Sequence, residues 1–88
     1  MAETIEIRGH EVEIDQAPMK SWAAFKLFRA IEESDSVFSK ADATFELCRM
    51  VSGLGAEELA GLCGGESADM DDILGVSLEI IKAATPKN

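Results

Sequence analysis

The sequence predicts an α+β fold, mainly α, in which an N-terminal β-hairpin packs on a bundle of three to four short helices. Residues 3–15 alternate between apolar and polar side chains, as in a half-buried pair of strands. After residue 18, apolar residues recur at the three-to-four-residue spacing of amphipathic helices, and serine- and glycine-rich breaks separate the periodic segments. With 88 residues and no long linker, the chain is predicted to form one domain over residues 1–88.

The hairpin is predicted over residues 3–15, with Gly9-His10 as its two-residue turn. Glycine at the first loop position suits a primed turn, which requires positive φ. This register brings four β-branched side chains onto one face, in the pairs Ile7–Val12 and Ile5–Ile14, and it places Glu6 opposite Glu13. Because an isolated hairpin is marginal in water, the apolar face must be covered, and the helix that follows is the nearest candidate.

A first helix is predicted over about residues 19–33, starting just after Pro18. It carries the only tryptophan, two of the four phenylalanines and three of the eight basic residues, and there is no acidic residue between Ala17 and Ile31. On a helical wheel, its apolar side chains cover well over half of the circumference. A helix this apolar requires cover from more than one direction.

Three further helices are predicted, over about residues 37–52, 56–62 and 69–84. Either Ser36 or Ser39 can be the N-cap of the first of these, and Gly53 ends it. Gly55 precedes the next helix, with Glu58 at the third position of a capping box. Three aspartates at the start of the last helix favour its N-terminus electrostatically.

The helices predicted over residues 37–52 and 69–84 each have an apolar stripe that is predicted to be buried. In residues 37–52 the stripe consists of Val37, Ala41, Thr44, Phe45, Cys48 and Val51. In residues 69–84 it consists of Met70, Ile73, Leu74, Ser77, Leu78, Ile81 and Ala84. We expect both stripes to face the core.

The formal net charge of −9 narrows the classes of partner. Binding to nucleic acid or to an anionic membrane surface requires lysine and arginine, so neither is expected. No apolar run approaches the length of a membrane span, and the acidic N-terminus lacks the apolar segment of a signal peptide. We therefore expect a cytoplasmic protein whose partners are proteins.

The residues that usually carry chemistry are sparse. His10, Cys48 and Cys63 lie in three separate segments and do not form a zinc-ligand pattern, so no metal is expected. The acidic segment of residues 69–72 lacks the calcium-loop pattern. No nucleophile–histidine–acid order, phosphate loop or dinucleotide fingerprint is present. The sequence therefore predicts a protein that is not an enzyme and binds no cofactor.

A candidate partner-binding site lies on the first helix. Trp22 falls on its polar edge near Lys26 and Arg29, with Phe25 one turn away. Tryptophan and arginine are enriched at binding hot spots. Two interpretations remain open here. Either the hairpin or a later helix covers Trp22, or Trp22, Lys26, Arg29 and Phe25 form a site for a partner or for self-association.

The segment Asp35-Ser36-Val37 is similar to the attachment motif of acyl carrier proteins, which are small, acidic and helical. That resemblance implies phosphopantetheine on Ser36. The sequence departs from the family pattern in three ways: valine replaces leucine after the serine, Phe38-Ser39-Lys40 replaces the acidic residues that follow, and a hairpin replaces the first helix.

The organisation of the whole chain resembles the tail assembly chaperones of long-tailed bacteriophages and prophages. The resemblance rests on the alternating segment Ile5–Ile14, the helix that directly follows it, and the small acidic helices after that. It implies a non-enzymatic chaperone or scaffold that holds the helical tape measure protein soluble in the bacterial cytoplasm. A generic protein-interaction adaptor with the same fold is the alternative.

The family resemblance also implies a longer form made by translational frameshifting, whose extension recruits tail tube protein. Pro86-Lys87-Asn88 can be encoded CCA-AAA-AAC, which contains a slippery heptamer in the required phase. The excess apolar circumference of the first helix suits either a helical client or self-association, and the acidic remainder of the chain suits solubility.

Overall fold

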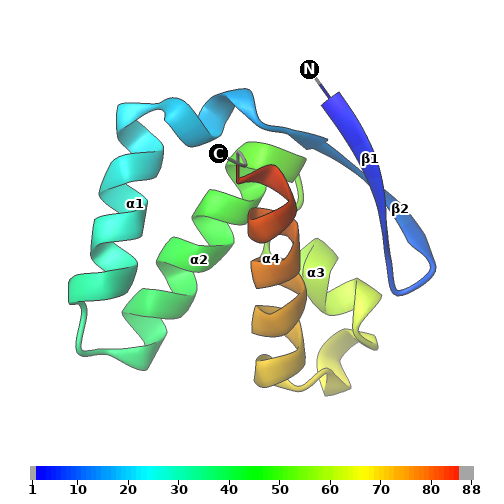
Figure 1. Cartoon of the computed structure of the whole chain (residues 1–88). Coiled ribbons are helices and arrows are strands. Elements are labelled where there is room, and N and C mark those ends of the chain that lie inside the picture. Colours follow the sequence, from blue (N-terminus) through cyan, green and yellow to red (C-terminus); the bar gives the residue numbers. More distant parts are fainter. Residues whose placement is uncertain (1, 86–88) are drawn as a thin grey trace.

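The computed structural model describes residues 2–85 and confirms the predicted fold class, an antiparallel hairpin followed by four α-helices (Figure 1). The strands are β1 (Ala2–Ile7) and β2 (His10–Asp15). The helices are α1 (Trp22–Glu33), α2 (Val37–Ser52), α3 (Ala56–Leu62) and α4 (Met70–Ala84). Short 3₁₀ turns occupy Ala17–Lys20 and Gly65–Ser67.

The predicted hairpin register was wrong by two residues. The turn is Arg8-Gly9, with φ of 53° and 81°, rather than Gly9-His10. The observed pairs are Ile5–Val12, Ile7–His10 and Glu6–Glu11. A turn with positive φ at both central residues matches the right-handed twist of the strands, and glycine takes its second position here. Side chains alternate with a period of two, so the two-residue shift leaves the same isoleucines and valine on the apolar face.

Arg8 holds the non-glycine position of this turn, and its side chain reaches across to α4. Its Nη2 donates a hydrogen bond to Asp72 Oδ1 at 3.1 Å. This bond, together with the charge of the carboxylate, raises the pKa of Arg8. Both side chains are largely exposed, so the pair adds little stability, but it connects the hairpin turn to the N-terminal end of α4.

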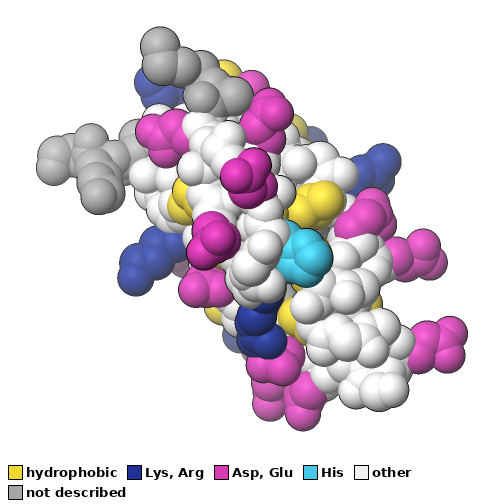
Figure 2. Space-filling model, turned by 90° about the vertical axis from the view of Figure 1, so that its right-hand side faces the viewer, with side chains coloured by type: hydrophobic (Ala, Val, Ile, Leu, Met, Phe, Trp, Pro, Cys, Tyr) yellow, Lys and Arg dark blue, Asp and Glu magenta, His cyan; other side chains and the backbone are white. Residues whose placement is uncertain are grey.

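The outer face of the hairpin is acidic. Glu6 lies opposite Glu11 and Thr4 lies opposite Glu13, so carboxylates on the two strands face solvent together. Figure 2 views the molecule from the hairpin side and shows Asp and Glu side chains spread across it. Like charges directly opposite each other cost some strand-pairing stability, so the hairpin depends on its apolar face.

The predicted start of the first helix at residue 19 was also wrong. Pro18 is the second residue of the 3₁₀ turn Ala17–Lys20, and the α-helix starts only at Trp22. Ser21 separates the two because its backbone is extended, with φ of −82° and ψ of 158°. Its Oγ donates to the Pro18 carbonyl at 2.7 Å and accepts from the Ala24 N–H at 3.1 Å. Ser21 is therefore the N-cap of α1.

The other helix ends follow the predicted caps closely. Ser36, rather than Ser39, caps α2, since Ser36 Oγ accepts from the Ser39 N–H at 3.3 Å. Gly53 ends α2 in the left-handed conformation, with φ of 77°. The Gly55 N–H donates to Glu58 Oε1 at 3.3 Å at the start of α3. Asp69 caps α4, so that helix begins one residue later than predicted.

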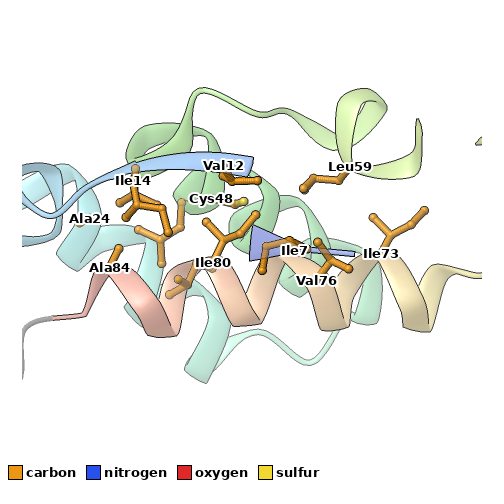
Figure 3. Packing of buried hydrophobic residues seen from close by; sticks show 13 residues of the cluster. Ile7, Val12, Ile14, Ala24, Cys48, Leu59, Ile73, Val76, Ile80 and Ala84 are labelled. Atoms are coloured by element: carbon orange, nitrogen blue, oxygen red, sulfur yellow. The ribbon is translucent and has the colours of Figure 1, made fainter. Parts of the chain in front are cut away.

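The core lies between the inner face of the hairpin and helices α2 and α4, and α3 contributes Leu59 (Figure 3). Ile7, Val12 and Ile14 point from the hairpin into this cluster. Apart from β1, the main contacts of β2 are with α2 and α4, so the first helix, which the sequence offered as the nearest candidate for the hairpin's apolar face, is not its main cover. Helix α2 is the central element, in contact with α1, α4 and β2.

The predicted stripes were partly wrong. In α2 the buried set gains Leu47 and Ala43, and Val37 is exposed. In α4 the buried set gains Val76 and Ile80, and Met70 and Leu78 are exposed. The prediction of burial is wrong for Val37 and Met70 because each is the first residue of its helix. The buried arc of α4 is wider on one side because it faces the hairpin as well as α2.

Leu47 lies on α2 and is fully buried, so its truncation is expected to destabilise the fold. Leu47→Ala is expected to lower the free energy of unfolding by about 2–5 kcal/mol, since it removes buried methyl groups and leaves a cavity. Asp42→Ala, an exposed position on the same helix, is the matched control and should change it by less than about 0.5 kcal/mol. Urea denaturation followed by circular dichroism measures both. Equal effects of the two substitutions would contradict this packing.

Candidate partner-binding surface

Helix α1 lies at the edge of the molecule and contacts α2 as its main helical neighbour (Figure 1). Only Ala24 of α1 is buried, while Leu27 and Ile31 are half-buried. These three residues lie on one side of the helix at three-to-four-residue spacing. The remaining apolar circumference, which the sequence showed to be unusually wide, stays uncovered by the described residues.

Trp22 and Phe25 occupy this uncovered side. Their side chains are 69% and 47% exposed. The two rings stack on each other, with centroids 5.2 Å apart and an interplanar angle of 24°. The interpretation in which another element covers Trp22 is therefore wrong. The pair is an exposed aromatic platform rather than part of the core.

Arg29 extends the platform along the helix. Its guanidinium carbon lies 5.9 Å from the centroid of the Phe25 ring, in the range of a cation–π contact. Its Nε and Nη2 donate to Glu33 Oε1 at 2.9 Å and 2.7 Å. The guanidinium is thus held between a ring and a carboxylate, which limits its side-chain freedom before any partner binds.

Lys26 completes the predicted set. It is exposed and lies four residues after Trp22, on the same side of α1. We call Trp22, Phe25, Lys26 and Arg29 the α1 surface. Phe28, 36% exposed, borders it. The α1 surface combines stacked aromatic rings with two cations, whereas the hairpin side of the molecule is dominated by carboxylates (Figure 2).

Sequence reasoning missed a further exposed aromatic residue outside α1, Phe38. It lies at the start of α2 and is 79% exposed, and its neighbour Val37 is 71% exposed. A signal for Phe38 was present in the sequence, because on a helical wheel it falls among Asp42 and Arg49 on the polar side of α2. The connection from α1 to α2 therefore also presents apolar side chains to solvent.

The residues considered for chemistry lie apart from one another. His10 is exposed at the start of β2. Cys48 is buried, and burial raises the pKa of its thiol more than the hydrogen bond to Ser52 lowers it. Cys63 is a half-buried free thiol after α3. Among residues 2–85, no group of three histidine, cysteine or acidic side chains is placed to hold a metal ion.

Ser36, the residue of the carrier-protein resemblance, is exposed at the N-terminus of α2. Its hydroxyl accepts from the Ser39 N–H, and its backbone N–H donates to Ser34 Oγ at 3.2 Å. These bonds account for the serine as a helix cap. They leave its hydroxyl accessible from solvent.

Comparisons with protein families, with curated proteins and with solved structures find no match to this chain. No helix in the part of the chain that the structure describes is long and apolar enough to cross a membrane. Pro86-Lys87-Asn88, whose codons bear on the frameshift expectation, lies outside the described residues.

The geometry of the α1 surface predicts that Trp22 contributes little to folding. Trp22→Ala is expected to change the free energy of unfolding by less than about 1 kcal/mol, because the ring is largely exposed. In the native protein, Trp22 fluorescence should show the red-shifted emission of a solvated indole and strong quenching by acrylamide. A blue-shifted emission with a destabilisation of about 3–5 kcal/mol on substitution would instead make Trp22 a core residue.

Proposed function

We propose that this protein is a non-enzymatic assembly chaperone or scaffold of the bacteriophage tail type, acting in the cytoplasm of a bacterial host. In this proposal the α1 surface holds a helical client, the tape measure protein. The observation that carries the proposal is the exposed stack of Trp22 and Phe25 with Arg29 on an otherwise acidic molecule.

The physical requirements of a holding chaperone support this proposal. A long amphipathic helix exposes an apolar stripe that drives aggregation before it finds its final partner. A platform of rigid aromatic rings covers such a stripe at low entropic cost, since each ring has only two rotatable bonds. The cations of Lys26 and Arg29 select clients with acidic residues beside the stripe. The net charge of −9 then keeps the complex in solution.

The resemblance of architecture supports the same proposal. The hairpin leads through a short turn into α1, and small helices follow, which is the organisation on which the resemblance to tail assembly chaperones rests. A frameshifted longer form that recruits tail tube protein belongs to this proposal too. Reading the codons for residues 86–88, and the length and helical character of the gene that follows, tests that part directly.

A generic interaction adaptor is the alternative within the same class. It would use the same α1 surface, so the identity of the client separates the two functions. The other alternative is a carrier protein. Its supporting observation is the exposed hydroxyl of Ser36 at a helix N-terminus. It leaves the exposed rings of α1 without a role.

Co-expression tests the chaperone proposal. With the long helical protein encoded downstream as client, the native chain should raise the fraction of client that stays soluble, and the two should co-elute on gel filtration. Trp22→Ala should lower that fraction several-fold, because it removes a hot-spot anchor of about 2 kcal/mol or more. Met70→Ala is the matched control, since Met70 is exposed to the same degree as Phe25 but lies on α4.

Two results would count against the proposal. The first is a client whose solubility does not respond to the native chain. The second is a loss of client solubility that is equal for Trp22→Ala and Met70→Ala, because this would place the binding site elsewhere.

Mass spectrometry tests the carrier alternative. Incubation with coenzyme A and a phosphopantetheinyl transferase is expected to leave the mass of the chain unchanged, because the residues after Ser36 depart from the carrier pattern. A known acyl carrier protein in the same reaction is the positive control. An adduct that disappears in Ser36→Ala would establish the carrier function instead.

A further inference from the structure

Strand β1 has an open edge. The sheet contains two strands, and no third strand lies beside β1 among residues 2–85. In a hairpin closed by a two-residue turn, the pair that flanks the turn exchanges both backbone hydrogen bonds, and such pairs alternate along the strands. Starting from the pair Ile7–His10, every second residue of β1 therefore points its backbone groups toward β2. The N–H and C=O groups of Thr4 and Glu6 point the other way, and both residues are exposed.

This edge lacks the features that usually block strand addition. Over its six residues β1 contains no proline and no lysine, and its pairing with β2 is continuous, without a bulge. An added strand would pair the N–H and C=O groups of Thr4 and Glu6 that point away from β2. An open, regular edge of this kind favours pairing with another chain.

The space beside the edge is open, and both apolar and charged side chains line it. A groove of about 430 Å³ lies between β1 and α4, lined by Ile5, Ile7, Glu79, Lys82 and Ala83. A second hollow of about 410 Å³ shares Lys82 and Ala83 with it and reaches Glu3. Ile5 is only half-buried, unlike the other apolar residues of the hairpin's inner face. A strand added to β1 would cover it.

We propose that β1 pairs antiparallel with β1 of a second copy about a twofold axis, so that two hairpins form one four-stranded sheet. A residue whose backbone groups point away from β2 can exchange hydrogen bonds only with such a residue of the second copy. For Thr4 and Glu6 this leaves three central registers. Pairing Glu6 with Glu6 sets like charges opposite each other, and pairing Thr4 with Thr4 sets Glu3 opposite Ile5. Pairing Thr4 with Glu6 sets Glu3 opposite Ile7, but it avoids the opposed glutamates and places Ile5 directly against Ile5 of the second copy, which the Thr4–Thr4 register does not.

The charges beside the groove are self-complementary in this arrangement. Each copy carries one carboxylate, Glu79, and one ammonium group, Lys82, at the groove. A twofold axis at Ile5 lets Lys82 of each copy approach Glu79 of the other. The net charge of −9 on each copy acts against this over longer distances, and salt screens that repulsion. The dimer should therefore strengthen as the salt concentration rises.

This inference is independent of the client proposal. In Figure 1, α1 lies on the opposite side of the molecule from β1, so pairing through β1 leaves the α1 surface open. A dimer then presents two α1 surfaces. Two sites joined in one particle gain avidity for a long client without any new contact.

Sedimentation equilibrium tests the dimer. The native chain should reach about twice its monomer mass of 9.5 kDa as its concentration approaches about 1 mM, and at lower concentration when salt is raised from about 0.05 M to about 0.5 M. Thr4→Pro removes the outward N–H but no bond to β2, and edge strands tolerate proline. It should weaken association by about tenfold or more while the circular dichroism spectrum and the melting temperature stay close to native values. Thr4→Val keeps the N–H and is the matched control, with association unchanged.

Disulfide trapping tests the register in a Cys63→Ser background, in which Cys48 stays buried. Directly opposed residues of a pair without hydrogen bonds have Cα atoms about 4.5 Å apart, within the range of a disulfide. Ile5→Cys should therefore form a covalent dimer on mild oxidation. Thr4→Cys should stay mostly monomeric, since two copies of residue 4 lie diagonally at about 7–8 Å.

Three outcomes would overturn the inference. The first is a chain that stays monomeric under every condition. The second is a dimer that Thr4→Pro does not weaken but Trp22→Ala does, because the contact would then lie on the α1 surface. The third is a cross-link that forms faster through Thr4→Cys than through Ile5→Cys, which would exclude the proposed register.

Discussion

The packing of the hairpin's apolar face against α2 and α4 is the contact on which the rest of the structure depends. Ile7, Val12 and Ile14 fill the space between these helices. With the hairpin on one side and α4 beside it, α2 has one flank left for α1. Helix α1 therefore buries a single narrow stripe, although its sequence is apolar around most of its circumference. The exposed rings of Trp22 and Phe25 follow directly from where the hairpin packs.

Much of the fold could be predicted from local patterns. The boundaries of α2 and α3 were correct because Ser36, Gly53 and Gly55 mark them with specific capping chemistry. The composition of the hairpin's two faces was also correct, despite a wrong register, because the period of a strand is two. The turn was missed because Arg8 is an unusual residue at positive φ, and local preference pointed to the glycine as the first turn position.

The sequence could not show which helices pack against the hairpin. The alternation of residues 3–15 shows that the hairpin needs cover, but it does not say which helix provides it. That choice decides whether Trp22 is core or surface. The candidate residues themselves could be picked from the sequence, because a run without acids stands out in an acidic chain. Their stacking at 5.2 Å, and the placement of Arg29 over Phe25, required the three-dimensional structure.

The single-sided burial of α1 also separates two kinds of constraint along one helix. The fold constrains one side of the helix, because Ala24, Leu27 and Ile31 pack toward α2. Only a binding partner constrains the residues of the α1 surface, because no described neighbour covers them. Substitutions on that outer side can accumulate without passing through a loss of stability. The same scaffold is thus free to change its binding preference during evolution while its core stays fixed.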